Sequence, residues 1–161
     1  MNEEARESAG YILAASNRLG GLCEDVIDFL RMPAVASGDM VALALHEMRK
    51  SLMPVAADRG AGLRIVEPVG GGAAVLVHSS VRRVVSHVLE HVVRTAAGDV
   101  TIGASIRGAG DMLLIAVSPA ALGIGDGEDG IIAVAAELLA AHGGQLSVDG
   151  CRLELLFPIV T

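Results

Sequence analysis

A stripe of valines at helical spacing over residues 81–93 limits the folds that this chain can adopt. Its apolar members are Val81, Val84, Val85, Val88, Leu89, Val92 and Val93. Intervals of three and four residues place them on one face of an α-helix. Valine is a poor helix former, so this helix is expected only where its apolar face packs against a sheet. The stripe therefore predicts an α/β architecture.

Helical and strand patterns alternate along the rest of the chain. Further helices are predicted over 5–31, 39–58 and 131–141, and strands over 62–67, 73–77, 100–106, 112–117, 145–148 and 151–158. Hairpins join most of the strands. The predicted fold class is therefore an α/β (α+β) two-layer sandwich, in which helices cover one face of a mixed, mostly antiparallel sheet. A long N-terminal helix precedes the sandwich.

Local signals refine the ends of these elements. Asp39 is predicted to be the N-cap of the second helix, and Pro54 to kink that helix or end its regular part. Ser79 or Ser80 is predicted to cap the valine helix. The turns after the last helix and in the last hairpin carry glycines that favour left-handed backbone.

The helix over 5–31 is long for a globular domain and carries a wide apolar stripe that includes Tyr11, Leu13 and Leu19. A stripe of that kind needs a partner helix. We therefore expect residues 1–34 to form a dimerisation-type helix and 35–161 a separate domain. A homodimer through residues 5–31 is the expected assembly.

Composition limits the classes of molecule that this chain can bind and the cellular compartment in which it is expected. The net charge is −7 and aromatic residues make up 2% of the chain. Both features disfavour nucleic acid as a partner, and the acidic balance also disfavours an anionic membrane surface. The start of the chain lacks the pattern of a signal peptide, so a cytoplasmic location is expected. Cys23 and Cys151 are expected to be reduced, buried small hydrophobes.

Four segments, in this order and at this spacing, resemble sensor histidine kinases. Glu24–Arg31 resembles the end of the second helix of that family's dimerisation domain, and Asp39–Arg64 resembles the linker with the first helix and strand of its ATP-binding domain. Val81–Arg94 lies where the family has its N-box helix. Leu138–Val148 resembles the helix and strand after the last glycine box. The resemblance implies the GHKL, or Bergerat, fold over nearly the whole chain.

The nucleotide boxes of the family are degenerate in this sequence. His91 stands at the place of the asparagine that holds Mg²⁺, and an imidazole is a poor substitute for a hard oxygen ligand. Gly123 alone survives from the box that reads adenine, and Ile131 follows Gly130 where a second glycine belongs. No cofactor is therefore predicted. If ATP with Mg²⁺ is still bound, the resemblance implies a vestigial pocket that contains His91, Arg94, Gly123 and Gly130.

The segment before the last helix is equally unlike the family. Between Ile124 and Gly130 too few residues remain for an ATP lid, and Asp126, Glu128 and Asp129 add negative charge where a triphosphate would sit. Ile131 is expected to fill part of the space that phosphates occupy in working relatives. The pocket is thus predicted to have become structural.

Histidines elsewhere do not restore kinase chemistry. Residues 1–45 contain no histidine for the family's phosphoacceptor. His46 lies in a His-Glu-Met-Arg segment like the family's phosphoacceptor box, but its position in the order of segments makes it a solvated residue of the ATP-binding domain. His87 and His91 share a helix face at the spacing of a zinc pair, yet a zinc protease would need a third ligand and a substrate cleft. Neither a catalytic nor a metal site is predicted.

The resemblance and these departures predict a degenerate histidine-kinase-like protein in two-component signalling. It would act as a protein-binding or regulatory module without ATP turnover, and its partner would be a response regulator or a histidine kinase. Two alternatives stay open. One is a divergent histidine kinase that still binds ATP, and the other is a histidine phosphotransfer protein that uses His46.

Overall fold

The computed structural model of the chain describes residues 3–31, 39–67, 74–118 and 130–160. Contacts divide the chain into two compact units, Met1–Ala34 and Val35–Thr161. In the first unit the helix α1 spans Glu3–Arg31, which confirms the predicted helix. None of the described helices is long and apolar enough to cross a membrane.

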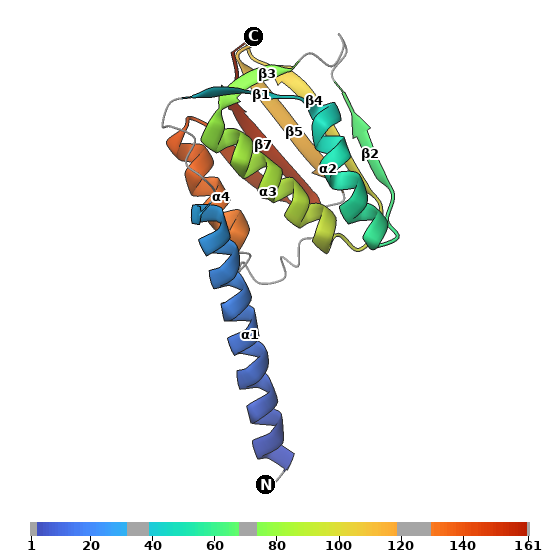
Figure 1. The fold of residues 1–161 in the computed structure, drawn as a ribbon, viewed down its shortest axis with the longest axis vertical. Coiled ribbons are helices and arrows are strands. Elements are labelled where there is room, and N and C mark those ends of the chain that lie inside the picture. The colour runs from blue at the N-terminus through green and yellow to red at the C-terminus, as the bar shows by residue number, and fades with distance from the viewer. Residues whose placement is uncertain (1–2, 32–38, 68–73, 119–129, 161) are drawn as a thin grey trace. The chain divides into compact units, whose positions relative to one another are not determined.

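The second unit holds the sandwich (Figure 1). Its elements in chain order are β1 (Met40–Leu43), α2 (Leu45–Asp58), β2 (Leu63–Val66), β3 (Val75–His78), α3 (Ser79–Thr95), β4 (Val100–Arg107), β5 (Met112–Ser118), α4 (Gly130–Ala141), β6 (Gln145–Asp149) and β7 (Arg152–Pro158). Five strands form one sheet in the order β2-β4-β5-β7-β6, and β1 pairs with β3 in a second sheet. The β2–β4 pair is parallel and the other pairs are antiparallel.

The helices α2, α3 and α4 lie on the same face of the five-stranded sheet, and α3 crosses its middle (Figure 1). This arrangement confirms the predicted fold class. All seven members of the valine stripe are buried, as are the inward side chains of the central strands, among them Ile102, Ile115, Leu155 and Phe157. Full burial of one such aliphatic side chain stabilises the fold by about 1.5–3 kcal/mol. The sheet thus supplies the packing that a valine-rich helix lacks by itself.

The predicted helix over 39–58 is wrong at its start. Residues Met40–Leu43 form β1, which pairs antiparallel with β3 through Met40↔His78 and Leu43↔Val75. Asp39 is therefore not an N-cap: Ala44 holds that place without a side-chain hydrogen bond, and the carbonyl of Asp39 accepts from the Ser79 amide at 3.0 Å. Pairing with a strand distant in sequence overrides the local helical pattern.

Pro54 does not end α2, which continues to Asp58. The residue lies on the exposed side of the helix. Proline removes one N–H and one helical hydrogen bond, so the carbonyl of Lys50 loses its partner. On the exposed side water can satisfy such a carbonyl, which makes the interruption tolerable.

The cap of α3 also differs from the prediction. The N-cap is His78, whose Nδ1 accepts a hydrogen bond from the Ser80 amide at 3.2 Å, while Ser79 and Ser80 are the first two residues of the helix. The predicted glycine turns are confirmed, with positive φ angles at Gly143 (74°) and Gly150 (58°). Cys23 and Cys151 are exposed free thiols, so the prediction that they are buried is wrong.

Candidate functional site

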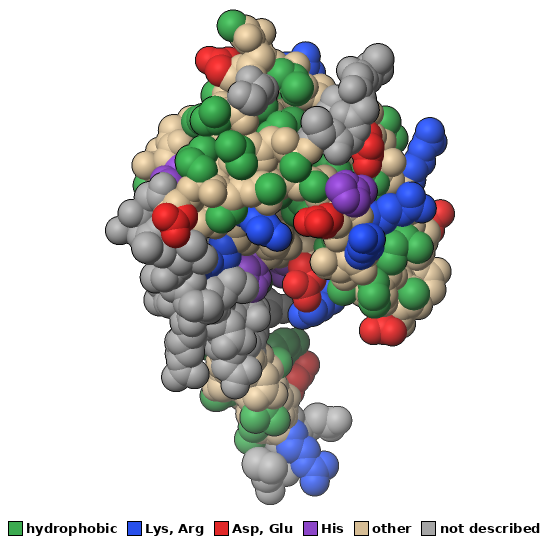
Figure 2. All heavy atoms as spheres, turned by 45° about the horizontal axis from the view of Figure 1, so that its top comes forward, with side chains coloured by type: hydrophobic (Ala, Val, Ile, Leu, Met, Phe, Trp, Pro, Cys, Tyr) green, Lys and Arg blue, Asp and Glu red, His purple; other side chains and the backbone are tan. Residues whose placement is uncertain are grey.

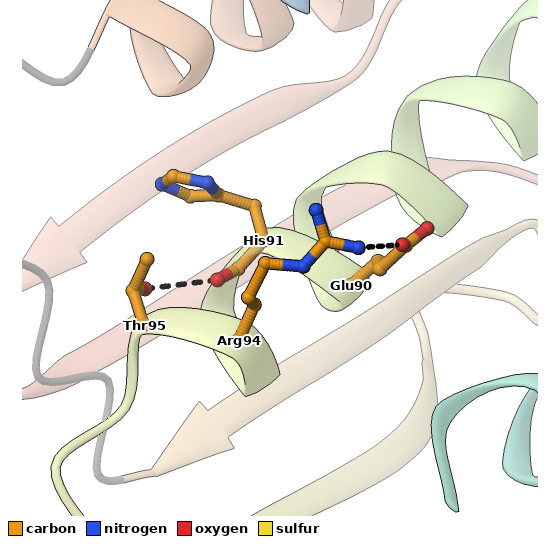
Figure 3. A network of polar contacts seen from close by, with 4 residues as sticks. All are labelled: Glu90, His91, Arg94 and Thr95. Carbon is orange, nitrogen blue, oxygen red and sulfur yellow. Dashed lines mark hydrogen bonds and ion pairs between the residues drawn. The ribbon is translucent and has the colours of Figure 1, made fainter. Parts of the chain in front are cut away.

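The last two turns of α3 carry His91 and Arg94, two of the four residues of the expected pocket. His91 is half-buried and Arg94 is exposed. The Arg94 guanidinium forms an ion pair with the Glu90 carboxylate one turn earlier, and the Thr95 hydroxyl donates to the His91 carbonyl at 2.8 Å (Figure 3). The His91 ring points away from the Glu90–Arg94 pair (Figure 3). The positive charge of Arg94 is therefore already paired with a carboxylate of the same helix.

The N-terminus of α4 supplies the other described residue of the predicted pocket. Gly130 is the first residue of α4, whereas Gly123 lies outside the described residues. The start of α3 meets the end of α4 where the rings of His78 and His142 stack, so the two helices run in opposite directions (Figure 1). Because the two helices are antiparallel, Gly130 at the start of α4 lies toward the same end of the pair as His91 and Arg94 near the end of α3.

Ile131 is half-buried rather than fully buried. The residues of α4 that reach the core are Ala135 and Leu139. That Ile131 fills part of the space occupied by phosphates in working relatives stays a prediction. The acidic segment with Asp126, Glu128 and Asp129 lies outside the described residues.

The opposite end of the α3–α4 pair holds a contact that the sequence did not predict. The ring centroids of His78 and His142 are 4.2 Å apart, and the ring planes differ by 27°. Burial lowers the pKa of His142 from its ordinary value of 6.5, and the nearby His78 lowers it further. The two residues are 64 positions apart (142 − 78), and no local pattern links them.

The remaining candidate histidines lie on different helices, His46 on α2 and His87 on α3. His46 is exposed in the first turn of α2, as expected for a solvated helical histidine, and His87 is half-buried on α3. Within the described ranges no group of three or more His, Cys, Asp or Glu side chains could hold a metal ion. On the face drawn in Figure 2, basic and acidic side chains are interspersed.

The pairing of Glu90 with Arg94 was missed at the level of sequence, although its signal was present. A glutamate four residues before an arginine is the favoured orientation for an ion pair on a helix. Both residues lie off the valine stripe of α3. Their spacing alone predicts the contact that the structure contains.

The two-layer sandwich has the fold of a histidine kinase ATP-binding domain, and a long helix precedes it in the chain. The histidine kinase AdeS of Acinetobacter baumannii is similar over 99% of this chain and 85% of its own, with 17% identity and a TM-score of 0.54. A histidine kinase from Burkholderia phymatum STM815 covers 99% of this chain and 89% of its own at 18% identity and a TM-score of 0.54.

The mycobacterial sensor histidine kinase MprB is similar over 75% of this chain and 98% of its own, with 12% identity and a TM-score of 0.52. No family model and no curated protein matches the sequence. The structural similarity to these proteins establishes the fold. Because the sequence identities are so low, the function has to be argued from the residues of the site.

Proposed function

We propose that this chain is a degenerate histidine-kinase-like protein that works in two-component signalling as a protein-binding module without ATP turnover. The observation that carries the proposal is the set of side chains at the C-terminal end of α3. There an imidazole replaces the oxygen ligand expected for Mg²⁺, and the neighbouring guanidinium is already paired. The fold and the site therefore point in different directions, one to a kinase and the other to a non-catalytic relative.

The described residues do not fit Mg-ATP. Mg²⁺ prefers oxygen ligands in near-ideal octahedral geometry, whereas His91 offers a nitrogen. A phosphate oxygen that approached Arg94 would compete with the Glu90 carboxylate, which carries the same sign of charge. The chain as a whole has a net charge of −7, which adds repulsion at long range.

The binding role is supported by α1. Tyr11, Ile12 and Leu19 are 70%, 67% and 64% exposed, and they lie within about 100° of one another around the helix axis. Large apolar side chains that lie exposed on one helix mark a surface that another protein covers. We assign this surface to a second copy of the chain in a homodimer, and the resulting helical bundle to contact with a response regulator or a histidine kinase.

The test is affinity capture from the native host with the full chain as bait, followed by mass spectrometry. The proposal predicts enrichment of a response regulator or a histidine kinase, and a loss of that enrichment with Leu19→Asp bait, whose dimer surface carries a charge. Absence of both protein classes from the captured set would contradict the signalling role.

The phosphotransfer alternative has its own readout. His46 is exposed and therefore accessible to a phosphorylated partner. Acid-labile phosphate on His46 after incubation with a phosphorylated regulator, absent from His46→Gln, would replace the proposed function with phosphotransfer.

A further inference from the structure

We propose that His78 and His142 form an acid-sensitive clamp, which joins the start of α3 to the end of α4 at neutral pH and opens when the imidazoles are protonated. The clamp would hold together the two helices whose opposite ends carry the degenerate site. This inference concerns regulation of the fold and does not depend on the proposed function.

The first argument is the hydrogen bond at His78. Its Nδ1 accepts from the Ser80 amide at 3.2 Å, so this nitrogen must keep its lone pair. Protonation would place an N–H where an acceptor is needed, and the cap would be lost. It would also put a positive charge at a helix N-terminus, where the macrodipole favours negative charge.

The second argument is the stack itself. Two half-buried imidazoles lie with their centroids 4.2 Å apart, so positive charge on both would be repulsive at short range. The helix that precedes His142 cannot offset this, although its C-terminal end favours a cation, because the net pKa shift of His142 is downward. Burial and His78 together oppose the charged form of His142.

Other charged groups on the surrounding elements do not account for this shift. Asp39 precedes β1, Arg82 and Arg83 lie in the first turns of α3, and Glu137 lies on α4. The causes of the lowered pKa are burial first and His78 second, and none of these four is among them. The responsive element is therefore the histidine pair.

The direction of the pH effect follows from the lowered pKa. In the unfolded chain His142 takes up a proton near pH 6.5, and in the folded chain it does so only at lower pH. The contribution of the clamp is therefore fully present above pH 6.5. It is lost as the pH falls through the lowered pKa of the folded state.

The experiment is amide hydrogen exchange on the full chain at about pH 7.5 and about pH 5, corrected for intrinsic exchange, since histidines change charge within that interval. The double variant His78→Asn, His142→Phe keeps a capping oxygen and a flat ring but cannot titrate. His46→Gln is the matched control on an exposed histidine. Acid should raise exchange several-fold in the first turn of α3 and the last turn of α4 of the wild type and the control, but not in the double variant.

Equal acid sensitivity of the double variant, or no acid effect in the wild type, would overturn the proposal. A second measurement keeps the test valid if the double variant fails to fold. In an NMR titration of the wild type, the ring signal of His142 should move below pH 6.5, and the Ser80 amide signal should move with it. Titration of His142 at pH 6.5 or above, or a Ser80 signal that does not respond, would reject the clamp.

Discussion

The Arg94 guanidinium and the Glu90 carboxylate are paired across one turn near the C-terminal end of α3. The pair is exposed, with relative exposures of 64% and 44% for the two side chains. Exposed ion pairs add little to stability, typically up to about 1 kcal/mol. The main effect of this pair is therefore electrostatic, because the Glu90 carboxylate neutralises the positive charge of Arg94.

Glu90→Gln should release Arg94 without creating a nucleotide site. The midpoint of thermal unfolding should shift by an amount that corresponds to less than about 1 kcal/mol. Addition of Mg-ATP should leave that midpoint unchanged, because His91 and Ile131 are still in place. Glu47→Gln, an exposed carboxylate on α2, is the control. Stabilisation by Mg-ATP in Glu90→Gln alone would mean that the ion pair masks a competent pocket.

Ile131→Gly introduces the second glycine that the resemblance to histidine kinases leads us to expect after Gly130. The half-buried side chain and the first turn of α4 together predict a loss of about 1–3 kcal/mol in the free energy of unfolding, from helix propensity and partial burial. Ile131→Ala separates the two causes, since it removes the side chain and keeps a good helix former. An unchanged midpoint that rises with Mg-ATP would point to an open, functional pocket.

Gly144 should tolerate no side chain. A Cβ at this position would lie 2.8 Å from the Leu156 carbonyl oxygen and 3.1 Å from that of Leu139. Gly144→Ala should therefore cost about 1–3 kcal/mol, as overpacking does. At Gly103 a Cβ meets nothing within 4 Å, so Gly103→Ala should be neutral or slightly stabilising. Chemical denaturation of both variants is the measurement, and equal midpoints would refute the steric account.

The sequence predicted those parts of the fold that depend on local pattern. The valine stripe of α3 and the hairpin glycine Gly150 each carry their signal within a few residues. The strand β1 carries none, because Met40–Leu43 continues directly into a helical pattern and becomes a strand only by pairing with β3. The stack of His78 on His142 likewise arises from the packing of α3 against α4, so no local motif could reveal it.

Dimerisation should reside in α1. Leu19→Asp places a charge on the face of α1 that carries Tyr11 and Ile12, whereas Asn17→Asp adds the same charge about 160° from Leu19 around the helix axis. Light scattering should give a dimer mass for the wild type and Asn17→Asp, and a monomer mass for Leu19→Asp and for a chain that starts at Val35. Equal association states for all four would show that α1 is not the interface.

Calorimetric titration of the full chain with Mg-ATP decides whether the chain still binds a nucleotide. Each charge-assisted contact contributes about 1.5–3 kcal/mol, so the loss of several should lower affinity by orders of magnitude. We expect no binding heat at nucleotide concentrations up to about 1 mM, which corresponds to a binding free energy weaker than about −4 kcal/mol. A saturable isotherm with a micromolar Kd would contradict it and restore the reading of the chain as a nucleotide-binding kinase.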